Sequence, residues 1–314
     1  MDSSQEPHAE PDTGPSASGP STTERDTGPS ASELPTAEQD GGQRHGVVTD
    51  APEDGYFGAS VAENYDDPAS DVFAPAAVEP AADLLAGLAA GGPALEFGIG
   101  TGRIALPLAR RGVPVHGIDL SRAMVEKLRA KPGGDAIDVT IGDFASTEVP
   151  GRGGFAVAYL VFNTIMNLTT QAEQVACFRN AAAHLAPGGT FVIEVGVPEL
   201  RLLPPGQTAV PFRVTANRWA FDHYDVATQA MSSNYVEVVD GRGSYRSIPF
   251  RYVWPAELDL MAQLAGMRLR DRWEGWGREP FTNESGQHVS VWEKVAPTAS
   301  AEQSDGANRA NRSE

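Results

Sequence analysis

Four residues at alternate positions, Glu96, Gly98, Gly100 and Gly102, follow one another where an apolar run ends and a helical pattern begins. Glycine at every second position lets the backbone bend sharply and approach a ligand with no Cβ atom in the way. A carboxylate two residues before the first glycine suits a ligand with an ammonium group better than one with a pyrophosphate. The spacing therefore predicts a small-molecule site at this turn.

Two familiar nucleotide sites fit this turn poorly. A dinucleotide fingerprint, G-x-G-x-x-G, that begins at Gly98 needs a third glycine where the sequence has Arg103. A phosphate-binding P-loop needs a Gly-Lys-Ser/Thr sequence after the turn, and none follows. An NAD-dependent oxidoreductase is thus disfavoured by Arg103, although it shares the alternating elements described next.

The elements that position this turn alternate between strand and helix. Apolar or β-branched runs predict strands at 94–97, 115–118, 137–141, 155–162, 190–195 and 288–295, and helical spacing predicts helices at 102–112, 121–131, 171–185 and 255–266. Pro187 and two glycines are expected to turn the chain between the third of these helices and the fifth strand. Alternation of this kind favours a parallel sheet covered on both faces, with ligands bound at the carboxyl ends of its strands.

About sixty residues between the strand at 190–195 and the helix at 255–266 exceed what such a sheet needs. Three runs with strand-like alternation, 217–228, 230–240 and 245–254, predict an antiparallel β lid inserted at about 198–254. The insertion starts at the carboxyl end of a strand, so it can cover the site. Its aromatic residues suit a small organic acceptor: Trp219, Phe221, Tyr224, Tyr235 and Tyr252.

Composition indicates one folded domain, residues 51–296, between two disordered tails, residues 1–50 and 297–314. Of the net charge of −18, the first 50 residues contribute −8 and residues 297–314 contribute −1, so the domain carries −9. An acidic domain without a Lys/Arg cluster is expected to bind no nucleic acid. No long apolar run predicts a membrane span, and the lone Cys177 excludes an internal disulfide, so we expect a cytoplasmic protein.

With these motifs in place, residues of about 60–295 resemble the class I S-adenosylmethionine-dependent methyltransferases of the small-molecule type. "LEFGIGTG" at 95–102 resembles the first motif of that family, "GDF" at 142–144 its adenine-edge motif, and "LVFNT" at 160–164 the end of its fourth strand. The resemblance implies a doubly wound, Rossmann-like α/β fold with a seven-stranded sheet whose last strand is antiparallel. It also implies S-adenosylmethionine as cofactor.

The resemblance assigns roles to individual residues. Asp119 would hold both ribose hydroxyls, Glu96 would face the amino group of the methionine, and Tyr65 would close over the cofactor. All the residues that the resemblance brings to the cofactor are the following: Tyr65, Glu96, Gly98, Gly100, Gly102, Arg103, Asp119, Leu120, Gly142, Asp143, Phe144, Val161, Phe162 and Asn163.

The expected reaction is methylation of a small-molecule acceptor at oxygen or nitrogen, without a metal. A hydroxyl acceptor usually needs a base within hydrogen-bond reach, and His223, Glu237 and His288 are the candidates. Asp222 and Asp225 lie in the same part of the lid. Beside the oxidoreductase, a non-catalytic S-adenosylmethionine-binding protein stays open as an alternative, and so does a homodimer.

Overall fold

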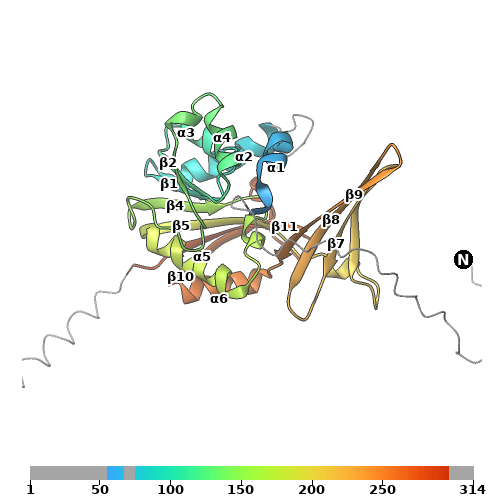
Figure 1. Cartoon of the computed structure of the whole chain (residues 1–314). Helices are drawn as coiled ribbons and strands as arrows, with labels where there is room; N and C mark the ends of the chain where they lie inside the picture. Colours follow the sequence, from blue (N-terminus) through green and yellow to red (C-terminus); the bar gives the residue numbers. More distant parts are fainter. Residues whose placement is uncertain (1–54, 67–74, 297–314) are drawn as a thin grey trace, which may run out of the picture. The chain divides into compact units, whose positions relative to one another are not determined.

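The computed structural model describes residues 55–66 and 75–296, so the two predicted tails lie outside the described residues (Figure 1). The strands of the larger sheet are β1 Ala94–Phe97, β2 Val115–Asp119, β3 Asp138–Ile141, β4 Phe155–Leu160, β5 Leu185–Gly196, β10 Met267–Trp273 and β11 Gln287–Lys294. Their order is β10-β11-β5-β4-β1-β2-β3. β1 to β5 run parallel and β11 runs antiparallel to β5, which confirms the predicted fold.

Helices cover both faces of this sheet. On one face, α2 (Pro75–Ala89) and α3 (Ala105–Arg110) pack on Ala94, Val157 and Val192. On the other face, α5 (Gln171–His184) and α6 (Pro255–Leu264) bury Cys177, Phe178 and Leu258 against the alternate strand residues. α4 (Arg122–Arg129) packs beside β2, and Ser121 caps it by accepting a hydrogen bond from the backbone N–H of Met124.

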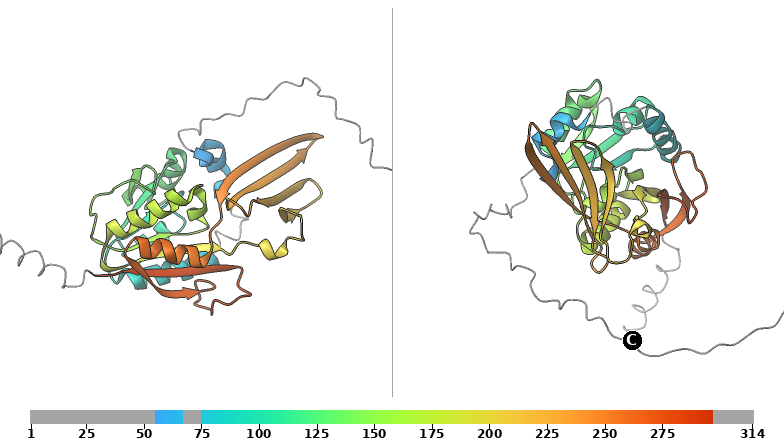
Figure 2. Two further views of the ribbon diagram at one scale, coloured as in Figure 1. Left: turned by 90° about the horizontal axis from the view of Figure 1, so that it is seen from below. Right: turned by 90° about the vertical axis from the view of Figure 1, so that its right-hand side faces the viewer.

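A second, antiparallel sheet contains β6 (Ala209–Val214), β7 (Arg218–Tyr224), β8 (Ala230–Val239) and β9 (Arg242–Arg251) in that order. We refer to it as the lid sheet. Asp240 and Gly241 both have positive φ in the two-residue turn between β8 and β9, as a tight hairpin with the twist of its strands requires. Figure 2 shows the lid sheet, in yellow to orange, extending from the larger sheet next to the blue segment 55–65.

The structure corrects the predicted lid and the predicted start of the fifth strand, and it ends the fourth strand at Leu160 instead of residue 162. The lid sheet has four strands and not three. The sequence pattern did not predict β6 because β6 contains Pro211, which lacks an N–H group. β6 is an edge strand, where a missing N–H is tolerated. β5 begins directly at Leu185, because Pro187 and the glycines after it are accommodated within the strand instead of forming a turn.

A buried polar cluster anchors the lid sheet to the core. Arg251, at the end of β9, is 5% exposed. Its guanidinium donates to Gln174 of α5 at 2.5 Å, to Glu257 of α6 at 2.8 Å and to Gln229 before β8 at 3.1 Å. Since the charge is paired and the N–H groups are used, the cluster fixes where the lid sheet leaves the larger sheet.

The segment before α2 is tied down as well. It consists of the 3-10 helix η1 (Gly55–Phe57) and α1 (Ala59–Tyr65). Asp66, at the end of α1, accepts a hydrogen bond from the Thr101 hydroxyl at 2.6 Å and pairs with Lys131 at 2.7 Å. The Ser121 hydroxyl donates to the carbonyl of Phe57 at 2.7 Å. These contacts hold the segment against the ends of β1 and β2.

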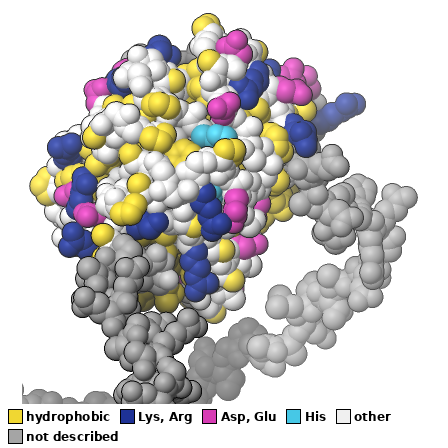
Figure 3. Space-filling model, turned by 90° about the vertical axis from the view of Figure 1, so that its left-hand side faces the viewer, with side chains coloured by type: hydrophobic (Ala, Val, Ile, Leu, Met, Phe, Trp, Pro, Cys, Tyr) yellow, Lys and Arg dark blue, Asp and Glu magenta, His cyan; other side chains and the backbone are white. Residues whose placement is uncertain are grey.

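The face turned away from the lid sheet carries basic and acidic side chains interspersed, with no field of one sign (Figure 3). Among residues 55–66 and 75–296, no helix is long and apolar enough to cross a membrane. Within the same ranges, no cluster of three His, Cys, Asp or Glu residues could hold a metal ion.

Candidate functional site

One large cavity, of about 1150 Å³, lies between the carboxyl ends of β1, β2 and β4 and the inner face of the lid sheet. Open α/β sheets bind ligands at this edge, where the chain order reverses between β1 and β4. Since a pocket for one small ligand typically has roughly 300–1,000 Å³, this cavity has room for a cofactor and an acceptor together.

The glycine-rich turn forms one wall. Gly98 and Gly100 line the cavity with φ of +71° and +54°, a left-handed conformation that side chains with a Cβ rarely adopt. The N–H of Gly100 donates to Asp119 Oδ2 at 2.6 Å, and the N–H of Ser121 donates to Asp119 Oδ1 at 2.8 Å. Asp119 thus fixes the turn after β1 to the turn after β2 while it lines the cavity.

The structure brings most of the predicted cofactor residues to this cavity. Those that line it are Tyr65, Gly98, Gly100, Arg103, Asp119, Leu120, Asp143, Phe144, Phe162 and Asn163. Those that do not line it are Glu96, Gly102, Gly142 and Val161.

Two of these glycines have packing reasons instead. A Cβ on Gly102 would collide with Leu128 of α4, and a Cβ on Gly142 would collide with Thr147. These glycines allow the segments after β1 and β3 to pack closely against Leu128 and Thr147, behind the cavity wall. Spacing alone could not separate such glycines from those that face the ligand.

Glu96 lies behind the turn and is 2% exposed. It accepts a hydrogen bond from the Tyr159 hydroxyl at 2.9 Å, because both side chains point to the same face of neighbouring strands. Burial raises the pKa of Glu96 to about 8, against the lowering effects of Tyr159 and Arg103. Burial therefore favours the protonated form of this carboxyl group.

The cavity-lining residues after β2 and β3 suit an adenosine. Asp143 accepts from the N–H of Ala145 at 2.8 Å, and the Phe144 ring stacks on Phe97 with centroids 5.9 Å apart. Leu120 and Met124 add apolar surface to the same wall. A flat apolar slot edged by carboxylates matches the hydroxyls, amine and ring of the expected cofactor.

The turn after β4 has a strained backbone. Phe162 and Asn163 have φ of +57° and +61°, which is uncommon for residues other than glycine. Glu194 of β5 holds this turn by accepting the Phe162 N–H at 2.9 Å, and it also accepts the Trp276 indole N–H at 2.8 Å. The Phe162 ring stays 46% exposed in the cavity, with the Arg103 guanidinium 4.6 Å from its centroid.

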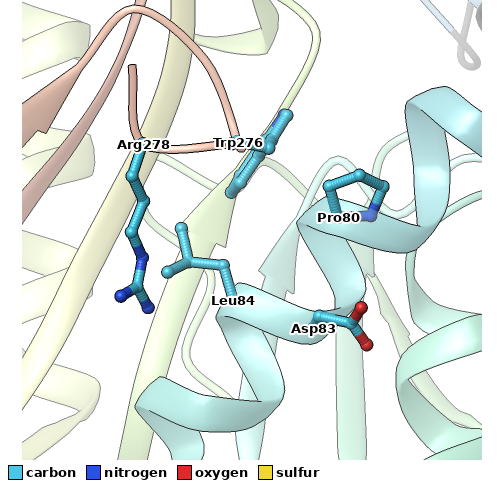
Figure 4. A pocket seen from close by; sticks show the side chains of 6 residues that line it. Pro80, Asp83, Leu84, Trp276 and Arg278 are labelled. Carbon is cyan, nitrogen blue, oxygen red and sulfur yellow. The ribbon is translucent and has the colours of Figure 1, made fainter. Parts of the chain in front are cut away.

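A second cavity, of about 240 Å³, lies between α2 and the loop after β10 and contains none of the predicted cofactor residues. Figure 4 shows Trp276, Leu84 and Arg278 around it. The indole that lines this cavity is the one that donates to Glu194, so its wall is connected to the turn after β4.

None of the three predicted bases lines the large cavity. His223 is exposed on the outer face of β7, and Glu237 forms an ion pair with Arg218 at 2.8 Å. His288 is 0% exposed in β11, its Nδ1 bonds to the Ser290 hydroxyl at 2.8 Å, and burial lowers its pKa to about 4. The geometry therefore favours none of them as the base.

The lid sheet instead presents side chains that the motifs did not indicate. These cavity-lining residues are Phe212, Asp222, Met231, Ser233, Tyr235, Arg246, Ile248, Pro249 and Phe250. Alternation places Asp222 and His223 on opposite faces of β7, and it is Asp222 that faces inward. The 3-10 helix η4 (Thr164–Asn167) completes the wall.

Comparisons with known proteins agree with this site. A family model described as "Methyltransferase domain" matches residues 94–189. The structure of the CcbJ methyltransferase from Streptomyces caelestis is 37% identical, covers 76% of this chain and 98% of its own, and has a TM-score of 0.67.

Two further methyltransferases are similar to this chain. Cypemycin N-terminal methyltransferase from Streptomyces sp is 27% identical over 205 residues, which are 64% of this chain and 82% of that protein. CalS10, an amino pentose methyltransferase from Micromonospora echinaspora, shares the fold at 23% identity with a TM-score of 0.52, over 69% of this chain and 90% of its own. The cavity, the order of its motifs and these similarities lead to one conclusion: the chain belongs to the class I S-adenosylmethionine-dependent methyltransferases.

Proposed function

We propose that this methyltransferase transfers the methyl group of S-adenosylmethionine to an oxygen or nitrogen of a small organic acceptor bound beneath the lid sheet. The observation that supports this is the continuity of the large cavity from Gly100 and Asp119 to Phe212 and Tyr235. Family membership removes the oxidoreductase alternative. An open cavity beside the cofactor residues also argues against a protein that binds S-adenosylmethionine without catalysis.

S-adenosylmethionine, when bound, supplies an electrophilic methyl group on a positively charged sulfur. The protein's part is to align the acceptor and to exclude water, because the charge disperses as the methyl group moves. Phe162, presented by a strained turn, and the lid-sheet aromatics that line the cavity, Phe212, Tyr235 and Phe250, are suited to this, whereas Trp219, Phe221, Tyr224 and Tyr252 do not line it. The chain's lone Cys177 is buried and free, which is consistent with the proposed cytoplasmic location.

A labelling experiment tests this proposal. The full chain is incubated with S-adenosylmethionine that carries a deuterated methyl group, together with a mixture of small amines, phenols and alcohols, and the products are analysed by mass spectrometry. We expect the label on a small molecule, and no label with Gly100→Val, whose side chain would enter the cofactor space. Label found only on peptides or proteins would contradict a small-molecule acceptor.

A further inference from the structure

The part of the lid sheet that lines the cavity is mostly apolar, with one carboxylate, Asp222, and one guanidinium, Arg246. Asp222 of β7 lies opposite Ser233 of β8, and Ser233 lies opposite Ile248 of β9. Met231 and Phe250 line the cavity on the same face. Among the described residues that line the cavity, Asp222 is the one acid contributed by the lid sheet.

Asp222 differs from the other acids of the cavity in its partners. Asp119 and Asp143 accept hydrogen bonds from backbone N–H groups of their own turns, and Glu173 accepts one at the start of its own helix. Asp222 accepts one hydrogen bond, from the Ser233 hydroxyl to Oδ1 at 2.6 Å. A carboxylate can accept several hydrogen bonds, so Asp222, which lines the cavity, keeps capacity for a donor group of a ligand.

No basic side chain neutralises Asp222 within the described part of the chain. Arg246, the basic residue of the lid sheet that lines the cavity, lies over the Tyr235 ring at 4.8 Å and makes no ion pair with Asp222. Burial raises the pKa of Asp222, and the charge of Glu199 raises it further. A cation placed beside this carboxylate would relieve both effects.

An ammonium group fits these surroundings better than a hydroxyl. Both can donate a hydrogen bond to Asp222 Oδ2, but only the ammonium brings the opposite charge that a half-buried carboxylate requires. We propose that Asp222, oriented by Ser233, binds the ammonium group of the acceptor, so that the substrate class is an amine with an apolar body. Where that nitrogen is the atom methylated, it releases one proton to solvent before it attacks, because an ammonium has no lone pair. This inference rests on the proposed function and names its acceptor.

Two probes with one carbon skeleton separate charge from shape: 2-phenylethylamine and 2-phenylethanol. Each is titrated at pH 7 into the full chain loaded with S-adenosylhomocysteine, and the affinity is measured by calorimetry. We expect the amine to bind roughly 10- to 100-fold more tightly than the alcohol, as a charge-assisted hydrogen bond implies. Equal affinities, or no detectable binding of the amine, would overturn the inference.

Three variants assign the preference to the carboxylate. Asp222→Asn should remove the preference for the amine and leave the affinity for the alcohol within about two-fold. Asp240→Asn makes the same change in the exposed β8–β9 turn and should alter neither affinity. Ser233→Ala keeps the carboxylate and should retain most of the preference for the amine. This variant still tests the role of the charge if the Asp222→Asn protein folds poorly.

Dependence on pH gives a second readout. Because protonated Asp222 has no charge, amine affinity in the parent should fall as the pH is lowered from 7 to 4, while the amine itself stays protonated. Asp222→Asn should show no such fall, and a fall of equal size in this variant would contradict the inference. A chain that binds neither S-adenosylmethionine nor S-adenosylhomocysteine would instead contradict the proposed function.

Discussion

Asp119 has two tasks, because its oxygens hold the turns after β1 and β2 through Gly100 and Ser121 while facing the cavity. We predict that Asp119→Ala weakens S-adenosylmethionine binding by about 2–4 kcal/mol, since charge-assisted hydrogen bonds are worth about 1.5–3 kcal/mol each and rarely add fully. Calorimetry checks this. Asp138→Ala, at an exposed position of β3, is the control. An unchanged dissociation constant would remove Asp119 from the cofactor site.

His223 lies on the outer face of β7, so its imidazole is remote from the acceptor side of the lid sheet. With the acceptor found by labelling, we predict that His223→Ala keeps the single-turnover rate within about three-fold of the parent and keeps the shape of the pH profile. Loss of a general base would instead lower the rate about 10²- to 10⁴-fold and remove the acidic limb. That result would mean that the lid sheet changes its orientation during catalysis, so that the outer face of β7 reaches the acceptor.

At the scale of elements, β5 and the loop after β10 together fix the turn after β4. Glu194 accepts from the Phe162 N–H and the Trp276 indole, and the N–H of Gly196 donates to Asn163 Oδ1 at 2.6 Å. These contacts stabilise two residues whose backbone would otherwise relax out of the left-handed region. The position of Phe162 in the cavity thus depends on residues more than thirty positions away.

We predict that Glu194→Ala lowers the free energy of unfolding by about 1–3 kcal/mol, because two hydrogen-bond donors lose their acceptor. It should also lower kcat more than it raises KM, since Phe162 would no longer be held at its position in the cavity. Glu194→Gln keeps one acceptor oxygen and should recover part of both losses. Thermal unfolding and steady-state kinetics measure the two effects. Normal kcat in a destabilised Glu194→Ala protein would show that the turn does not need this support.

The sequence predicts local features well where neighbouring residues decide them. The glycine-rich turn, the ends of β1 and β2 and the hairpin at Asp240 and Gly241 follow from patterns a few residues long. Alternation also separated Asp222 from His223. Which of the two faces the cavity depends on how Arg251 anchors the lid sheet to α5 and α6, through contacts as distant as Gln174. No local pattern contains that information.

At the scale of the whole molecule, the larger sheet buries one acid, Glu96, behind the strand end that forms the cavity wall. Glu96 lies on the α2 side of β1, away from the cavity lining, and shares its burial with Tyr159. The predicted role of Glu96, facing the amino group of the cofactor, requires the charged form, which burial disfavours. The burial of Glu96 and its predicted role therefore make opposite demands on one carboxyl group.

The raised pKa of Glu96 makes the stability of the cofactor-free protein depend on pH. The pKa of Glu96 is raised from an ordinary value of 4.5 to about 8, so between these values the folded chain holds a proton that the unfolded chain has lost. Rising pH then favours unfolding, with a slope from this group of at most ~1.4 kcal/mol per pH unit.

We predict that Glu96→Gln, which keeps a hydrogen-bond acceptor for Tyr159 and cannot ionise, removes that slope. Half-buried His116 and buried His184 and His288 have lowered pKa values and act in the opposite direction, but they are common to both proteins. Urea unfolding of parent and variant at pH 5, 6, 7 and 8, without cofactor, isolates Glu96 as the difference between the two curves. The free energy of unfolding of the variant, relative to that of the parent, should increase steadily as the pH rises. Curves that stay parallel would mean that Glu96 is ionised in the folded protein, already charged to receive an ammonium group.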